Sequence, residues 1–271
     1  DAQLSYNLKL IHENGKFKNT TIYNKTDIER LTKNYSNTAS NYFGTRDAIN
    51  LVGEYNFNLD TRIIYGLDNE FDRANLKDDW TGLYEKSDES VHSQYFDVQF
   101  RPFAKIYTTI GFRRDSHTTA GDYKTGRATV AYKLNNLSKI RSTYGTGIRF
   151  PTLYDYHYGT VVENLEDLNA EKSKSFDIGY ETFFQKIDTN FNISAFKIIY
   201  DDPITGWESN TDVLGGYTQK NSAGKVKSKG IELSTLWKPK NVFNIGFNYN
   251  YNDTYDGTDC EDPDRDATKC I

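Results

Sequence analysis

The sequence has no long apolar stretch. Its uninterrupted apolar runs reach only three residues, as in Ile63-Ile64-Tyr65 and Ile198-Ile199-Tyr200, whereas a membrane-spanning helix needs about 20. We therefore expect no transmembrane helix. The first residues, Asp1-Ala2-Gln3, also lack the charged start and the apolar centre of a signal peptide, so we interpret the chain as mature or truncated.

Clusters of basic residues are missing as well. The formal net charge is −5, and no run of adjacent Lys and Arg residues is longer than two. Nucleic acid and anionic lipid both attract basic clusters, so neither is expected to be the main partner.

Motifs of the common catalytic sites are also absent. The chain has no Gly-x-Ser-x-Gly segment, no His-Glu-x-x-His segment and no glycine-rich phosphate-binding loop. Its four histidines, His12, His92, His117 and His157, are scattered. We expect no enzyme, and an outer-membrane lipase is the enzymatic alternative.

Low hydropathy and high aromatic content are in apparent conflict. The mean hydropathy of −0.75 suits a solvated or disordered chain, but aromatic residues make up 15% of the sequence, and disordered segments are poor in aromatic and β-branched residues. The chain is therefore expected to be folded, with much of its polar surface in contact with water.

Apolar residues recur with a period of two. The clearest case is the segment 243–252, where Phe or Ile or Tyr alternates with Asn or Gly at every position, as in a β-strand with one apolar face. We count about twelve such strands from this pattern. Further examples lie at 47–57, 61–71, 95–113, 127–134, 175–184 and 229–237.

The connections between these strands alternate in length. Short connections are expected near 14–19, 58–60, 102–105, 134–138, 185–188 and 238–242, and long polar ones near 36–45, 73–90, 114–123, 147–171, 201–224 and 253–271. This alternation is typical of an outer-membrane barrel, which has short turns on one side and long loops on the other. The predicted fold is all-β, an antiparallel up-and-down transmembrane β-barrel whose lumen face is polar and whose outer face is apolar.

Aromatic residues follow the same division. They cluster at the ends of the predicted strands, where the aromatic girdles of a membrane barrel lie; a general preference of aromatic residues for strands is the alternative reason. The short-turn set is Phe57, Phe100, Phe103, Phe183, Phe184, Trp237 and Phe243, and the long-loop set is Tyr42, Phe43, Phe71, Tyr144, Tyr200 and Tyr251.

Two segments together resemble the central barrel signature of TonB-dependent outer-membrane receptors. The first runs from Tyr144 to Asp155 (YGTGIRFPTLYD) and the second from Leu168 to Glu181 (LNAEKSKSFDIGYE). Ala170 departs from the usual proline, and Leu165-Glu166-Asp167 departs from the usual Asn-Pro-Asn. Among the branches of the family, the vitamin B12 receptors are the most similar.

The resemblance implies a larger protein than this chain. Barrels of this family have about 22 strands around an N-terminal plug that contacts the TonB energising complex. Residues 1–271 are then an internal part of the barrel domain, with the plug and the C-terminal strands absent. A small barrel in which twelve strands close on themselves, as a channel, is the alternative.

The implied function is uptake of a scarce, large nutrient through the outer membrane of a Gram-negative bacterium by TonB-coupled active transport. Cobalamin or an iron–siderophore complex is the expected ligand, and the expected partners are the TonB complex, outer-membrane lipid and no nucleic acid. A passive porin is the first alternative and a haem receptor the second. Which ligand binds is not determined by the sequence.

Candidate ligand-binding residues are aromatic side chains on the long loops, which can stack on a flat or ringed ligand; anchoring at the membrane interface is an equal alternative. His157 lies where haem receptors of the family have a haem-ligating histidine, although a single loop histidine is more commonly a polar surface residue. The candidates are Trp80, Tyr84, Tyr154, Tyr156, His157, Tyr158 and Trp207.

The C-terminal segment has two further features. Asp262, Asp264 and Asp266 have the alternate spacing of calcium ligands, but Ala267 stands where a calcium loop has Gly, and a solvated acidic loop is the stronger interpretation. Cys260 and Cys270 are separated by nine residues and are expected to form a disulfide rather than a metal site. Such a bond would raise the free energy of unfolding by roughly 2–3 kcal/mol, because it reduces the conformational entropy of the unfolded chain.

Overall fold

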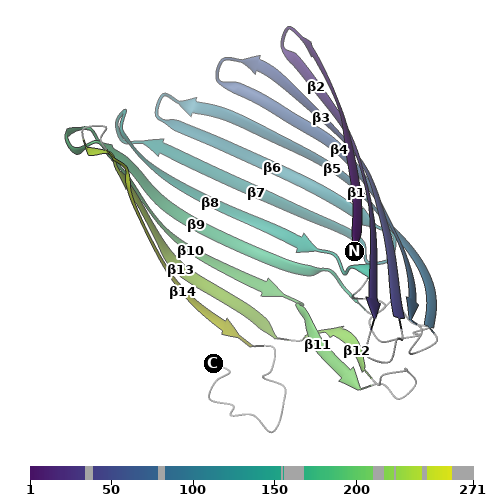
Figure 1. Cartoon of the computed structure of the whole chain (residues 1–271). Coiled ribbons are helices and arrows are strands. Elements are labelled where there is room, and N and C mark those ends of the chain that lie inside the picture. The colour runs from purple at the N-terminus through teal and green to yellow at the C-terminus, as the bar shows by residue number, and fades with distance from the viewer. Residues whose placement is uncertain are drawn as a thin grey trace.

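A computed structural model describes residues 1–33, 39–78, 83–153, 155, 168–209, 217–222, 224–239 and 243–257. Nearly all of them lie in strands (Figure 1). The strands are β1 (Ala2–Asn14), β2 (Phe17–Lys33), β3 (Ala39–Asn58), β4 (Thr61–Asp78), β5 (Leu83–Phe103), β6 (Ile106–His117), β7 (Gly121–Lys133), β8 (Ser138–Arg149), β9 (Glu171–Phe184), β10 (Thr189–Asp201), β11 (Ile204–Ser209), β12 (Tyr217–Asn221), β13 (Lys225–Trp237) and β14 (Ile245–Asp256).

Twelve of these strands form one antiparallel sheet. Each strand pairs with its neighbour in the chain, in the order β1 to β10, then β13 and β14. The β11–β12 hairpin is a separate two-stranded sheet between β10 and β13, and it extends beyond the end of β10 (Figure 1). The predicted all-β, up-and-down arrangement of about twelve strands is confirmed.

The sheet is curved and open. Figure 1 shows β1 and β14 on opposite sides of a trough, and within the described ranges these two strands do not pair with each other. The alternative in which twelve strands close on themselves is therefore wrong for this structure. The backbone N–H and C=O groups on the outer edges of β1 and β14 are therefore available to pair with a further strand.

Cross-strand register separates the residues into two faces. Tyr249 lies opposite Leu233, Leu233 opposite Ile193, and Ile193 opposite Tyr180, and all four are apolar or aromatic. Alternate residues point to opposite sides of a strand, so the apolar positions of all twelve strands form a continuous outer face. The other face, which we call the inner face, holds the polar positions.

Hydrophobic burial within the chain is slight. Among the described residues the only buried hydrophobic ones are Ala74, Leu168, Ala170 and Ile204, while large apolar side chains such as Phe247 and Ile178 are about half exposed. A water-soluble domain of this size buries its apolar surface in a core. This sheet instead presents its apolar face outward, as a membrane barrel does. None of the described residues forms a helix long and apolar enough to span a bilayer.

The short turns lie where the sequence predicts them, but three of the predicted long loops are mostly strand. The polar stretches 73–90, 36–45 and 114–123 largely continue the strands on either side. Polar residues do not end a strand where ion pairs join it to its neighbour, and Arg46–Asp72 and Arg73–Asp47 are two such pairs, at 2.5 and 2.7 Å. Between the described strands, the long connections that remain are 150–170 and 202–224, the second of which contains β11 and β12. Of the predicted loop 253–271, residues 253–256 belong to β14 and residues 258–271 lie outside the described residues.

The outward placement that a girdle requires is found for most of the aromatic residues but not for all. Register places Phe183, Tyr42 and Tyr200 on the inner face, because Tyr200, for example, lies opposite Ser173 and Val226. These three side chains therefore do not belong to an outer girdle. Most of the others, including Phe184, Trp237 and Tyr251, lie on the outer face and are more than a third exposed.

Candidate functional site

Paired arginines cover the inner face. Six inner-face arginines illustrate the arrangement. Each forms ion pairs with one or two carboxylates, most of which lie on the neighbouring strand. The pairs are Arg46 with Asp72 and Glu70, Arg62 with Glu54, Arg113 with Asp68 and Asp115, Arg127 with Asp97, Arg141 with Asp177 and Glu181, and Arg149 with Glu171 and Asp155. Such pairs fix cross-strand register and give a highly polar wall in which these six arginines are paired with ten carboxylates.

The last pair joins the two halves of the signature segment. Arg149 is the last residue of β8, and Glu171, the first residue of β9, lies directly opposite it. The guanidinium donates from Nε and Nη2 to the two carboxylate oxygens of Glu171, at 2.5 and 2.9 Å. This two-pronged geometry is the strong form of an arginine–carboxylate contact. The pair therefore closes the base of the long connection 150–170.

A short turn follows Arg149 and depends on Asp155. The carboxylate accepts hydrogen bonds from Thr152 N–H and Oγ1 (2.8 and 3.0 Å) and from Arg149 Nη1 (3.2 Å), while Asp155 N–H donates to Thr152 Oγ1 (3.2 Å). The mutual bonding of Thr152 and Asp155 is that of a capping box. Pro151, between them and Arg149, is fully buried, so the signature residues fold inward at this point.

Aromatic contacts attach the same turn to the wall. The Phe150 ring lies 4.6 Å from the His117 ring and 5.6 Å from the Tyr123 ring, measured between centroids. Tyr123 Oη accepts a hydrogen bond from the backbone N–H of Ala170 at 3.1 Å, and Ala170 is completely buried. The Phe150 end of the 150–170 connection thus contacts β6 and β7, and the Ala170 end contacts β7.

The second long connection is tied to the first. Glu171 Oε1 accepts the backbone N–H of Ile204 at 2.7 Å, and Ile204 packs with Leu168 in a small buried cluster. The Asn221 side chain accepts from Asn169 N–H (2.8 Å) and donates to the carbonyls of Asn169 and Asp202. We call the set Arg149, Phe150, Asp155, Leu168, Ala170, Glu171, Ile204 and Asn221 the loop-base junction.

A buried histidine completes the wall beside the junction. His117 Nδ1 accepts the backbone N–H groups of Thr119 and Ala120 at 3.1 and 3.0 Å, which requires this nitrogen to be unprotonated. The other ring nitrogen, Nε2, lies 3.3 Å from Glu89 Oε2. Both side chains are almost inaccessible to water, and neither Glu89 Oε2 nor His117 Nε2 has a hydrogen-bond partner within the described structure.

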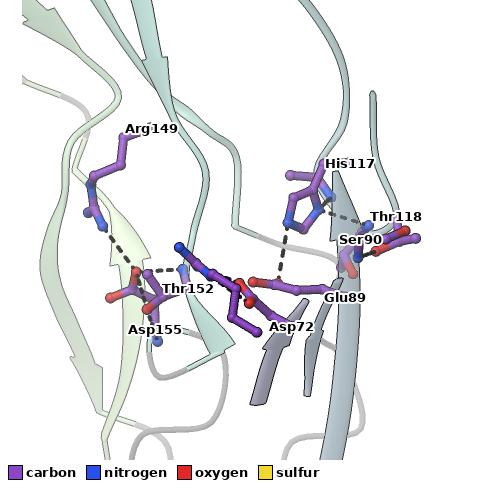
Figure 2. A network of polar contacts seen from close by, with 11 residues as sticks. Asp72, Glu89, Ser90, His117, Thr118, Arg149, Thr152 and Asp155 are labelled. Carbon is purple, nitrogen blue, oxygen red and sulfur yellow. Dashed lines mark hydrogen bonds and ion pairs between the residues drawn. The ribbon is translucent and has the colours of Figure 1, made fainter. Parts of the chain in front are cut away.

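Figure 2 shows these groups together. Arg149, Thr152 and Asp155 lie on one side, His117 and Glu89 on the other, and Asp72 lies between them. The network therefore extends from β4 to the 150–170 connection, at the long-loop end of the inner face. Within the described residues no group of three or more His, Cys, Asp or Glu could hold a metal ion. The described contacts anchor the two long connections to the wall.

The arginine also stabilises the charged form of Glu171. These two groups lie at the strand ends, beyond the apolar outer face. The hydrogen bond from Arg149 is the main reason why the pKa of Glu171 is lowered from 4.5, and the hydrogen bond from the Ile204 N–H contributes further. In turn, the hydrogen bond from Glu171 raises the pKa of Arg149. Both side chains are therefore charged at neutral pH.

This lowered pKa predicts how the junction responds to acid. A carboxylate with a lowered folded-state pKa stabilises the protein above its unfolded pKa, and this stabilisation is lost as pH falls through the folded value. We expect Glu171→Gln to reduce the melting temperature of the intact protein at neutral pH. The difference from wild type should shrink below pH 4.5, and a difference that does not change with pH would contradict the prediction.

Most of the predicted site residues lie outside the described residues. Tyr84 and Trp207 have their backbones placed in β5 and β11, but their side chains are not described. The ligand-binding, haem, calcium and disulfide assignments therefore all stay predictions. The residues outside the described ranges are Trp80, Tyr154, Tyr156, His157, Tyr158, Asp262, Asp264, Asp266, Cys260 and Cys270.

The residues of the junction were missed as functional residues by the sequence interpretation. Arg149, Asp155 and Glu171 belong to the quoted signature, which was a usable signal for them. His117 and Glu89 had no such signal, because each is an isolated polar residue in the sequence and they meet only when β5 pairs with β6.

The chain matches a family model described as "TonB dependent receptor-like, beta-barrel" over residues 1–269. No curated protein sequence matches it. Solved structures that are similar to it include the copper transporter OprC, at 14% identity and a TM-score of 0.74, with 95% of this chain and 46% of OprC covered.

Two other similar structures are a siderophore receptor and an iron transporter by name. The siderophore receptor PirA from Pseudomonas aeruginosa is 16% identical with a TM-score of 0.73, over 93% of this chain and 49% of PirA. The FrpB iron transporter from Neisseria meningitidis (F3-3 variant) is 14% identical with a TM-score of 0.75, over 93% of this chain and 43% of FrpB. At these identities the likeness concerns the fold. The chain spans about half the length of these proteins.

Proposed function

The chain belongs to the family of TonB-dependent receptor-like β-barrels, and on this premise we propose that it is part of the barrel of an outer-membrane receptor. The receptor binds a scarce, large nutrient at the cell surface and admits it by TonB-coupled active transport. An iron–siderophore complex is the proposed ligand, and cobalamin is the alternative. The observation that supports this function best is the contrast between an apolar outer face and a charged inner face.

The proposal includes strands outside this chain. Residues 1–271 supply twelve strands of a barrel of about 22. This is supported by the two free edges, β1 and β14, and by the coverage of only about half of the similar structures. A plug domain inside the completed barrel would contact TonB, and neither is part of the described sheet.

The inner face fits a receptor better than an open pore. Each of its six paired arginines has one or two carboxylate partners, so these arginines do not form the row of uncompensated cations that lines an anion-selective pore. The loop-base junction holds the roots of two long connections against the wall. Loops with fixed roots can present ligand-binding side chains, including the aromatic candidates near Tyr84, Tyr156 and Trp207, in a defined geometry.

Uptake by whole cells tests this proposal. Cells that express the intact receptor should accumulate radiolabelled iron–siderophore complex or cobalamin at a saturable rate, and this uptake should stop in a strain without TonB. Uptake that rises linearly with concentration and does not need TonB would indicate a porin instead. Chemical conversion of the nutrient by the purified receptor would indicate an enzyme.

A further inference from the structure

Five lysines on the outer face lie close together at the long-loop end of three adjacent strands. We call this set the lysine patch. In sequence they are spread over three separate segments, but register on β9, β10 and β13 brings them side by side, and each is exposed. The lysine patch consists of Lys174, Lys197, Lys225, Lys227 and Lys229.

The patch begins where the apolar outer face ends. Moving toward the long loops, Phe176 is followed on the same face of β9 by Lys174, Ala195 on β10 by Lys197, and Ile231 on β13 by Lys229. Lys197 lies directly opposite Lys229 on β13 and Phe176 on β9, and the apolar Ile199 lies between Lys174 and Lys227. The change from apolar to basic therefore occurs at nearly the same height on adjacent strands. In a membrane this height is the boundary between acyl chains and headgroups.

Positive charge in the patch is only partly compensated. Asp201 pairs with Lys225 at 2.7 Å and with Lys174 at 3.7 Å, and Asp253 pairs with Lys229 at 3.2 Å. Within the described part of the chain, Lys197 has no ion-pair partner, and Lys227 lies over the ring of Tyr255. Five lysines against two aspartates leave a surplus of three positive charges in a chain of net charge −5.

The arrangement itself is unfavourable without a counter-ion. Like charges directly opposite each other on adjacent strands are destabilising, and Lys197 faces Lys229 in this way. A bridging anion would remove the repulsion. Lysine ammonium groups bind phosphate as point charges and do not need a planar partner.

We propose that the lysine patch binds the phosphorylated headgroup of an anionic lipid in the outer leaflet of the surrounding membrane. The position of the patch directly beyond the apolar face selects a lipid over a free solute, because the acyl chains of that lipid would lie on Phe176, Ala195 and Ile231. This inference rests on the proposed membrane location, and it adds a lipid partner that is independent of the nutrient.

Lipid titration of the purified intact receptor tests the inference. The receptor in detergent is titrated with diphosphoryl lipid A or with its dephosphorylated form, and bound lipid is measured by native mass spectrometry. Each lysine beside an anionic lipid surface strengthens binding several-fold, so the triple variant Lys197→Gln, Lys227→Gln, Lys229→Gln should bind the phosphorylated lipid about 100-fold more weakly than wild type.

A matched control removes three lysines at the short-turn end. Lys133→Gln, Lys186→Gln, Lys238→Gln changes the net charge equally, and this variant should bind the lipid as wild type does. Equal binding of the two lipids by wild type, or equal weakening in both triple variants, would overturn the inference. So would complete loss of lipid binding on adding inorganic phosphate at the same phosphorus concentration, because the site would then bind free phosphate.

The outcome can be separated from that of the transport proposal. TonB-dependent uptake is measured in cells with the nutrient, whereas lipid binding is measured without it. A receptor that imports the nutrient but does not distinguish the two lipids refutes only the lysine patch. A receptor that prefers the phosphorylated lipid but imports nothing refutes only the transport function.

Discussion

Replacing Ile110 by arginine is expected to prevent most of the intact protein from assembling in the membrane. Ile110 lies at the middle of the outer face of β6, between Thr108 and Phe112, and it is more than a third exposed. An arginine facing lipid near the bilayer midplane costs about 2–4 kcal/mol in a membrane barrel. The measurement is the fraction of receptor in isolated outer membranes that keeps the unheated electrophoretic mobility of a folded barrel.

The neighbouring residue gives the matched control. Thr109 is adjacent in sequence but points to the inner face, where a wet lumen accepts a charged side chain. Thr109→Arg should therefore assemble nearly as well as wild type. If both variants assembled equally well, the outer face would not meet lipid, and a soluble sheet or a different membrane arrangement would have to be considered.

Replacing Arg149 by alanine is expected to weaken nutrient binding by more than tenfold. The substitution removes both hydrogen bonds to Glu171 and the bond to Asp155, and Glu171 also holds the Ile204 N–H. Removing one partner of a charged pair leaves the other carboxylates without compensation. Because Arg149 is about half exposed, we expect a stability loss of only about 1–2 kcal/mol, so the main effect is on loop position.

Affinity and stability together identify this role. Binding of an iron–siderophore complex is measured by fluorescence quenching, and unfolding by thermal denaturation. Arg127→Ala is the control, because it breaks a comparable pair with Asp97 in the same wall but touches neither long connection. An Arg149→Ala variant with unchanged affinity would show that the loop-base junction does not position the binding loops.

Much of the fold can be predicted from the sequence because its determinants are local. Alternation such as Phe247-Asn248-Tyr249-Asn250 sets a strand and its apolar face within a few residues. Turns are local as well: Gly15, at φ 59°, occupies the turn between β1 and β2. The polar stretches were harder to predict, since nothing local distinguishes a polar loop from a polar strand. Residues 73–90 are mostly strand because ion pairs and backbone hydrogen bonds continue to join them to the neighbouring strands.

The candidate site was predicted only in part, for a related reason. Arg149 and Glu171 belong to a recognisable signature, but their pairing requires β8 and β9 to meet in one register. His117 and Glu89 carry no sequence signal at all, since a histidine is buried or exposed according to what packs around it. Aromatic side chains on the loops were the predicted recognition residues, whereas the described contacts place a charged network at the roots of those loops.

The sequence by itself determined that the chain forms about twelve amphipathic strands with turns at set positions, because a period of two and turn-forming residues act over short distances. Tertiary structure decided which residues became neighbours. Lys174, Lys197 and Lys229 do not form a basic cluster in the sequence, which argued against an anionic lipid as the main partner. Pairing of β9, β10 and β13 places them together at the edge of the apolar face, because cross-strand register is a property of distant segments and not of any one of them.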